Sequence, residues 1–238
     1  MVYKYCENRN FEDFASGRVL LHRTGYPNFP VRLAQEIFCR CMERIGSPEQ
    51  ICIYDPCCGG GYLLTVLGFL NYGRIGSIAA SDISAEAVEL ARENLSLLCL
   101  EGLRQRIEQL GRLRDLHGKS SSLEALESAE NLLGIVTGAA RGIEREVFQA
   151  DILSPGALKG RDFKADIVFT DVPYGNLVEW QEGQDDAICL LDRLLPVIKD
   201  TSVVAVCSDR RQKFRSDYFR RVEKQAVGKR LFQIFVPA

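Results

Sequence analysis

The chain has 238 residues, 46% of them hydrophobic and 26% charged, which is ordinary for a globular protein and fits one α/β domain over residues 1–238 with an insertion. The formal net charge of −2 excludes a polycation, so any nucleic acid has to be bound by local basic patches. No apolar run reaches the roughly 20 residues that span a membrane, and the N-terminus lacks the apolar core of a signal peptide, so we expect a cytoplasmic protein.

The first hundred residues alternate between helix and strand patterns. Apolar residues at helical spacing predict a helix over 31–44, and an apolar stretch over 62–70 also has helical length. Short apolar runs over 51–55 and 77–83 predict strands, and each run contains an acid at its carboxyl end. Ser84 is a suitable N-cap for a helix after the second strand.

The next segment, from about 100 to 141, has two helix-like stretches and no strand pattern, which predicts an inserted helical hairpin. This order of elements predicts an α/β fold with a Rossmann-like, doubly wound, mainly parallel sheet of seven strands, which binds ligands at the carboxyl ends of its strands. The remaining expected elements are strands at 146–152, 165–170 and 202–208, a helix at about 185–198, and a closing hairpin of strands at 221–227 and 231–236.

A glycine loop, Asp55-Pro56-Cys57-Cys58-Gly59-Gly60-Gly61, follows the first strand. Its glycines let the backbone approach a ligand closely and turn into the next helix. The loop lacks the GxGxxG spacing of dinucleotide enzymes and the lysine of a phosphate-binding loop. A carboxylate beside an uncharged loop suits a cationic ligand without phosphates, such as S-adenosylmethionine, with Asp55, Pro56, Gly59 and Gly61 as candidate contacts. A tight turn that only connects strand and helix is the alternative.

Two further acids are expected at strand ends, where an α/β sheet places ligand groups. Asp82 can accept both hydroxyl protons of a ribose, or it can act as a helix-capping acid. Asp151 can accept N–H bonds from an adenine, with Ile83 and Ile152 on either side of the ring. Taken alone, Asp151 fits equally well as a turn acid before Ser154.

The segment Asp171-Val172-Pro173-Tyr174 follows a strongly apolar strand and is similar to the D/N-P-P-Y/F motif of methyltransferases that modify amines of bases. Asp171 can orient an acceptor nitrogen, while Pro173 shapes the turn and Tyr174 stacks on the target base. An aspartate can also accept the proton of guanine N1, so the motif leaves open whether the acceptor is a ring nitrogen or an exocyclic amine. A simple strand-to-turn junction is the alternative.

A basic run near the C-terminus suggests contact with RNA phosphates. Phe214 and Tyr218 are interleaved with it and suit base stacking. The inserted hairpin is also basic, but acids are mixed into it, so a solvated face is an equal alternative there. The candidate RNA-binding residues are Arg210, Arg211, Lys213 and Arg215, and the candidates for the mouth of the site, each of which could equally be packing, are Tyr26, Phe29, Arg32 and Trp180.

Nine cysteines contain no CxxC pair, and the chain has only two histidines, so no metal site is expected. Cysteine is a good small core residue in a reducing cytosol, and we therefore interpret the nine as reduced structural thiols.

Five stretches resemble the AviRa family, the avilamycin-resistance methyltransferases of large-subunit ribosomal RNA: residues 25–34, 55–68, 80–83, 118–119 with 123–125, and 170–175. The resemblance implies a Rossmann-like methyltransferase fold with added helices, S-adenosylmethionine as donor, a guanine of 23S ribosomal RNA as target, and resistance to an orthosomycin-type antibiotic. Two departures stand out: Gly60 replaces a common serine, and Val172 replaces a common proline.

Three other functions remain as alternatives. A DNA amino-methyltransferase would share the loop and the Asp171 motif, but no target-recognition domain is evident. A non-catalytic protein that binds RNA or the cofactor would keep the fold without turnover. A nicotinamide oxidoreductase is disfavoured by the absent GxGxxG. We expect a monomer.

Overall fold

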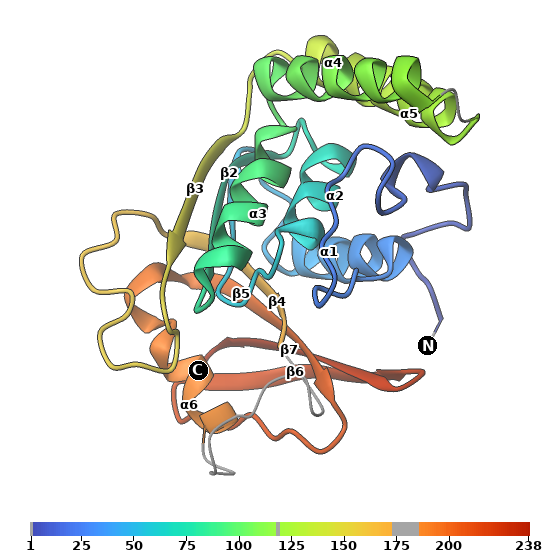
Figure 1. Ribbon diagram of the computed structural model, residues 1–238. Helices are drawn as coiled ribbons and strands as arrows, with labels where there is room; N and C mark the ends of the chain where they lie inside the picture. Colours follow the sequence, from blue (N-terminus) through green and yellow to red (C-terminus); the bar gives the residue numbers. More distant parts are fainter. Residues whose placement is uncertain (1, 118–119, 173–185) are drawn as a thin grey trace.

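The computed structural model describes residues 2–117, 120–172 and 186–238. Its centre is a seven-stranded sheet with the order β3-β2-β1-β4-β5-β7-β6 (Figure 1). The five strands from β1 to β5 run parallel, and β7 is antiparallel to both β5 and β6. The strands are β1 (Ile51–Asp55), β2 (Ile75–Asp82), β3 (Glu144–Gln149), β4 (Ala165–Asp171), β5 (Ile198–Asp209), β6 (Phe219–Val227) and β7 (Arg230–Pro237).

Helices cover both faces of this sheet, as β1 illustrates. All five of its residues are buried, and they alternate between the two faces because strand side chains have a period of two. Ile51 and Ile53 pack in the core under the first three helices, whereas Cys52 and Tyr54 pack in the core under α6 (Figure 1). The helices are α1 (Val31–Arg44), α2 (Tyr62–Leu70), α3 (Ala85–Ser96) and α6 (Asp186–Arg193).

The predicted insertion is a hairpin of two long helices, α4 (Leu100–His117) and α5 (Ser120–Gly138). The two helices pack against each other, and α5 also contacts the short 3-10 helix η1 (Glu12–Phe14). Because α3 runs back from the end of β2, the hairpin lies at the amino ends of the parallel strands (Figure 1). The insertion is therefore remote from the edge where ligands are expected.

Several predicted bounds differ from the structure, and the largest differences concern β3, α6 and β5. β3 ends at Gln149, so Asp151 lies two residues beyond the strand instead of inside it. The helix expected at 185–198 ends at Arg193 and is followed by the 3-10 helix η3 (Leu195–Val197), because Pro196 has no N–H with which to continue the α-helical hydrogen bonds. β5 consequently begins at Ile198, earlier than expected.

Candidate active site

A cavity of about 870 Å³ lies at the carboxyl edge of the parallel strands. Its floor consists of strand ends and the loops that follow them, at 55–60, 82–84, 150–155 and 171–172. Its other side is formed by residues of the segment 21–29, which we call the N-terminal wall. The volume lies within the usual range for small-molecule sites, and we refer to this space as the strand-end cavity.

The glycine loop contributes to the strand-end cavity through Gly59 and Gly60. Gly59 has a φ of 51°, and its N–H donates to Asp82 Oδ2 at 2.9 Å. Gly61 packs away from the cavity, since a Cβ built on it would lie 2.9 Å from the Cα of Ala91 in α3. Glycine at position 61 therefore allows the loop to pack closely on α3, and the cofactor contact at Gly61 stays a prediction.

Asp55 is almost completely buried at the end of β1, with 2% of its surface exposed, and it lines the cavity. The N–H of Cys57 donates to its Oδ1 at 3.0 Å. Burial raises the pKa of Asp55 to about 7, although the Thr170 hydroxyl and the Cys57 N–H oppose this rise. The charges of Asp82 and Asp171 raise the pKa further, so three carboxyl groups at this edge favour a cationic ligand.

Asp82 and Asp151 also line the cavity, but each is engaged in its own loop. Asp82 accepts the N–H of Ser84 at Oδ1 in addition to that of Gly59 at Oδ2. Asp151 accepts the N–H of Leu153 and the hydroxyl of Ser154, at 3.0 and 2.6 Å. The bonds of Asp151 correspond to the turn alternative, whereas α3 is capped by Ser84, whose hydroxyl accepts the Ala87 N–H at 3.2 Å, and not by Asp82. The remaining lone pairs of both acids stay available to a ligand. The flanking Ile83, which is 62% exposed, and the buried Ile152 both face the cavity.

Asp171 is the last residue of β4 and lies at the rim of the strand-end cavity. The next residue, Val172, is fully buried and donates its N–H to the carbonyl of Cys207 in β5 at 2.9 Å. Burial raises the pKa of Asp171 to about 6, and Arg230 counteracts this rise. Pro173, Tyr174 and Trp180 lie outside the described residues.

The N-terminal wall is held by residues that the sequence did not single out. Asn94 of α3 is 1% exposed; it accepts the N–H of Leu21 at 2.7 Å and donates to the carbonyls of Leu21 and Gly60 at 3.0 and 2.8 Å. One buried amide thus joins the wall to the glycine loop across the cavity. Tyr26 lies within 3.4 Å of the Ser84 hydroxyl, hydroxyl to hydroxyl.

Of the candidates for the mouth of the site, Tyr26 and Phe29 line the cavity. Arg32 does not, because its Nε donates to the Cys6 carbonyl at 3.1 Å and its guanidinium lies 3.9 Å from the centre of the Tyr3 ring. For Arg32 the packing alternative is therefore correct.

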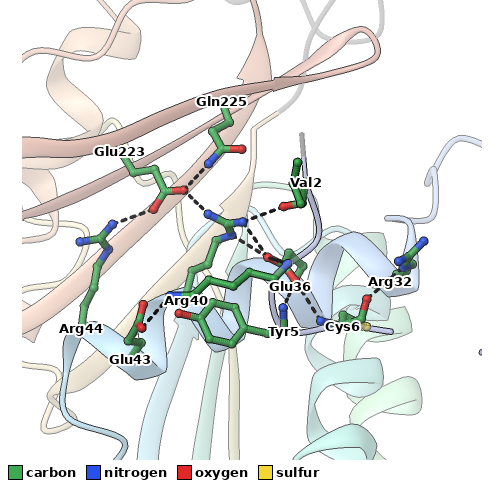
Figure 2. A network of polar contacts seen from close by, with 11 residues as sticks. Val2, Tyr5, Cys6, Arg32, Glu36, Arg40, Glu43, Arg44, Glu223 and Gln225 are labelled. Atoms are coloured by element: carbon green, nitrogen blue, oxygen red, sulfur yellow. Dashed lines mark hydrogen bonds and ion pairs between the residues drawn. The ribbon is translucent and has the colours of Figure 1, made fainter. Parts of the chain in front are cut away.

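The first residues of the chain are fixed by a buried carboxylate on α1 (Figure 2). Glu36 is completely buried and accepts the backbone N–H groups of Lys4, Tyr5 and Cys6 at 2.8–2.9 Å. The guanidinium of Arg40 donates to Glu36 as well.

The same network reaches the far edge of the sheet, because Arg40 and Arg44 of α1 both contact Glu223 of β6 (Figure 2). In the sequence, Glu223 is one of the few acids within the basic run near the C-terminus. In the structure its carboxylate is bound to two arginines of α1.

The four candidate RNA-binding residues, Arg210, Arg211, Lys213 and Arg215, are all exposed in the loop after β5. We call residues 210–215 the basic loop. Phe214, by contrast, is 4% exposed and packs in the core with α6, so the predicted stacking role for this ring is wrong. In the insertion, Arg106 donates to the carbonyls of Arg18 and Val19 and supports the N-terminal segment.

Comparison with known proteins assigns this architecture. A family model described as rRNA methyltransferase AviRa matches residues 1–230. The chain belongs to the AviRa family. A relative from Streptomyces viridochromogenes, the 23S rRNA (guanine(2535)-N(1))-methyltransferase, is 37% identical over 235 residues, which cover 96% of this chain and 93% of that protein.

Solved structures agree with the assignment to the AviRa family. The rRNA methyltransferase AviRa of Streptomyces viridochromogenes has a TM-score of 0.88 and 35% identity, covering all of this chain and 96% of that one. TrmN from Thermus thermophilus, at 15% identity and a TM-score of 0.54, shares the fold alone and covers 88% of this chain and 49% of its own. The predicted family, fold class and methyltransferase activity are thereby confirmed.

Other features of this AviRa-family chain concern metals, thiols and membranes. Among the described residues, no group of three or more His, Cys, Asp or Glu side chains is placed to hold a metal ion. All nine cysteines are free thiols, and none is fully exposed, in agreement with structural roles. Within the described ranges, no helix is long and apolar enough to cross a membrane.

Proposed function

We propose that the chain transfers the methyl group of S-adenosylmethionine to N1 of a guanine in 23S ribosomal RNA, acting as a cytoplasmic monomer. The observation that carries the proposal is the partly buried Asp171 carboxylate, which lines the strand-end cavity. Support comes from a relative, 37% identical, whose name states guanine N1 of 23S rRNA.

The residues of the strand-end cavity fit this donor. S-adenosylmethionine supplies an electrophilic methyl group on a sulfonium and carries an ammonium, a ribose and an adenine but no phosphate. Asp55 and the glycine loop together offer a buried carboxylate and an exposed stretch of backbone to a cationic group of the donor. Asp82 has lone pairs for ribose hydroxyls, and Ile83 and Ile152 offer apolar surface for a ring. Pro56 closes the floor beside Asp55.

The acceptor requires a base, because guanine N1 carries a proton at neutral pH and becomes a nucleophile only when that proton leaves. Asp171 is suited to this role, since a pKa of about 6 leaves it mostly ionised at neutral pH yet basic enough to take a proton. An N1–C bond forms as the S–C bond breaks, and the N1 proton passes to Asp171. A general base of this kind contributes about 10²–10⁴-fold in rate.

The test is Asp171→Asn with 23S RNA and labelled donor. We expect kcat to fall by about 100-fold or more while donor affinity changes by less than about threefold. Asp209→Asn is the matched control, because Asp209 ends the neighbouring strand β5 and its carboxylate is bound to Arg211 of its own loop. Wild-type turnover by the Asp171 variant would disprove the proposed base.

Mapping the methylated position separates the alternatives. Label in 23S RNA at a guanine N1, found by mass spectrometry of digested RNA, supports the proposal. Label only in duplex DNA would favour the DNA amino-methyltransferase, and label on an exocyclic amine would move the acceptor atom. Strains with and without the gene test whether methylation lowers sensitivity to an orthosomycin-type antibiotic, as we expect.

The basic loop is the part of this proposal that concerns RNA binding. Its four cations point into solvent after β5, and Arg210 is anchored by donating to the Gly228 carbonyl at 2.6 Å. Replacing Arg210 and Arg211 by Gln should weaken RNA binding and reduce the slope of log affinity against log salt by about 2. Arg112 and Arg114 of α4, equally exposed but at the opposite end of the sheet, form the control pair. A larger loss in the control pair would move the RNA surface to the insertion.

A further inference from the structure

Arg230 occupies an unusual position for a basic residue of the C-terminal hairpin. It opens β7, where its backbone lies between Asp209 of β5 and Val227 of β6. Its side chain is 24% exposed, in contrast to the exposed arginines of the basic loop. Its Nε lies 3.7 Å from Asp171 Oδ2, so the guanidinium lies beside the Asp171 carboxylate.

The guanidinium of Arg230 also contacts an aromatic ring. The Arg230 guanidinium lies 5.3 Å from the centre of the Phe29 ring, within the range of a cation–π contact. Phe29 belongs to the N-terminal wall and contacts Phe169 edge-on, with ring centres 5.7 Å apart and planes at 85°. Phe169 lies two residues before Asp171 on β4, so the wall and β4 together hold Arg230 against the carboxylate.

The two oxygens of Asp171 differ in their surroundings. Oδ2 faces Arg230, whereas Oδ1 is buried and has no hydrogen-bond partner within the part of the chain that the structure describes. A buried carboxylate oxygen without a donor is unfavourable by roughly 1–3 kcal/mol, which an acceptor N–H in the site would relieve.

We propose that Arg230 is a positioning residue of the methyl-transfer site: it holds Oδ2 of Asp171 and thereby presents Oδ1 to the acceptor N–H. This role rests on the proposed function of Asp171 as the base. Arg230 itself exchanges no proton. The N1 proton passes to Oδ1 as the methyl group is transferred, and it leaves to water after the product departs.

The electrostatics of Asp171 agree with this geometry. Among the described groups, Arg230 from β7 lowers the pKa of Asp171, while the charge of Asp171 raises the pKa of Asp55 from β1 and of Cys207 from β5. Burial raises the pKa of Asp171 to about 6, and Arg230 is the group that restrains the rise. Without Arg230 the pKa rises further, so a larger fraction of Asp171 is protonated, and unable to act as a base, at any given pH near neutrality.

The experiment compares wild type with Arg230→Met, Arg230→Lys and the neighbouring Lys229→Met, which lies exposed in the hairpin turn. We expect the acid limb of the kcat profile to move up by about one pH unit in Arg230→Met, so that activity falls about fivefold at pH 6 and hardly at all at pH 9. In Arg230→Lys the acid limb should lie close to its wild-type pH, and in Lys229→Met it should not move. Equal loss of activity at every pH, with an unmoved limb, would overturn the proposal.

A second measurement keeps this result separate from the proposed function. Carboxyl ¹³C NMR follows the titration of Asp171 directly, without RNA, in wild type and in Arg230→Met. The Asp171 midpoint should move upward in the variant. An unmoved midpoint rules out the positioning role even if the wild type methylates RNA. A shifted midpoint in a protein that does not methylate 23S RNA would instead refute the proposed function and leave the Asp171–Arg230 pair intact.

Discussion

Two buried carboxyl groups, Glu36 in the α1 network and Asp55 in the strand-end cavity, have opposite surroundings. Glu36 is 0% exposed and Asp55 2%, so both lose nearly all contact with water. Burial alone would raise the pKa of Glu36, but three backbone N–H groups and Arg40 lower it below its ordinary value. At Asp55 burial prevails and raises the pKa to about 7, because only Thr170 and the Cys57 N–H oppose it.

The number of hydrogen-bond donors around each carboxylate distinguishes the structural Glu36 network from the ligand-binding strand-end cavity. In the Glu36 network every oxygen of the acid is used, so the charge is stable in the absence of any ligand. In the strand-end cavity Asp55 and Asp171 have too few donors and are electrostatically unfavourable until something positive or protonated arrives. Removing the charge in the Glu36 network should therefore lower stability and leave ligand binding unchanged. Removing the charge of Asp55 should raise stability and weaken ligand binding.

Glu36→Gln should have the largest effect on stability. The amide removes the charge that faces Arg40 and cannot accept all four donors, so we expect a loss of about 3–5 kcal/mol in the free energy of unfolding, measured with urea. Because the pKa of Glu36 is lowered, its contribution is present above its ordinary value of 4.5 and is lost as the pH falls through the lower folded-state pKa. The affinity of the folded variant for the methyl donor should stay within about threefold of wild type. A variant as stable as wild type would show that Glu36 does not stabilise the fold.

Asn94→Ala should come next, since Asn94 belongs to the scaffold but contacts the site. Three hydrogen bonds disappear and two buried carbonyls lose a donor, which should lower stability by about 2–3 kcal/mol. Because these bonds connect Leu21 with Gly60, the KM for the donor should rise several-fold while kcat changes little. Asn131→Ala is a suitable control, because the Asn131 amide contacts exposed Asp13 far from the cavity. An unchanged donor KM would leave Asn94 as packing only.

Asp55→Asn should act in the opposite direction on stability. Its raised pKa means that stability is greatest below the unfolded value near 3.8 and is lost as the pH rises through about 7. The neutral amide escapes this loss, so the melting temperature of the variant should exceed that of wild type at pH 8 and approach it at pH 5. Donor affinity should fall at least about tenfold if Asp55 contacts the cationic ligand. A variant that is less stable than wild type at pH 8 would contradict the comparison.

Arg44→Met should have the smallest effect. Arg44 is 32% exposed and contacts a Glu223 carboxylate that Arg40 also holds, so its removal should lower stability by no more than about 0.5–1 kcal/mol. The same urea titration checks this, and a loss as large as that of Glu36→Gln would mean that exposed members of the network contribute as much as buried ones.

The sequence predicted the local parts of this fold well. The bounds of α1, β1 and α2 match their predictions because apolar spacing within each segment specifies them. The strand-end acids were also predictable, since a parallel sheet brings the carboxyl ends of its strands to one edge.

The supporting residues were not predictable in this way. Glu36, Asn94 and Arg230 acquire their roles from partners far away in the chain, and nothing in their own segments marks those partners. Phe214 was misjudged for a related reason. It stands among charged residues, yet the segment after β5 returns along the face that α6 covers, where Ser216 bonds to Asp192.

The close packing of the glycine loop restricts how the sequence of this chain can drift over evolutionary time. A Cβ built on Gly60 would lie 2.6 Å from Leu90 Cδ2, and Leu90 is itself 2% exposed. A serine at position 60 is therefore accepted only after the leucine moves or is replaced by a smaller residue. The two positions should covary among relatives, and an ancestor that carried serine in the loop should differ at position 90 as well. A Gly60→Ser exchange made alone, and its recovery by Leu90→Ala, would expose this epistasis in the laboratory.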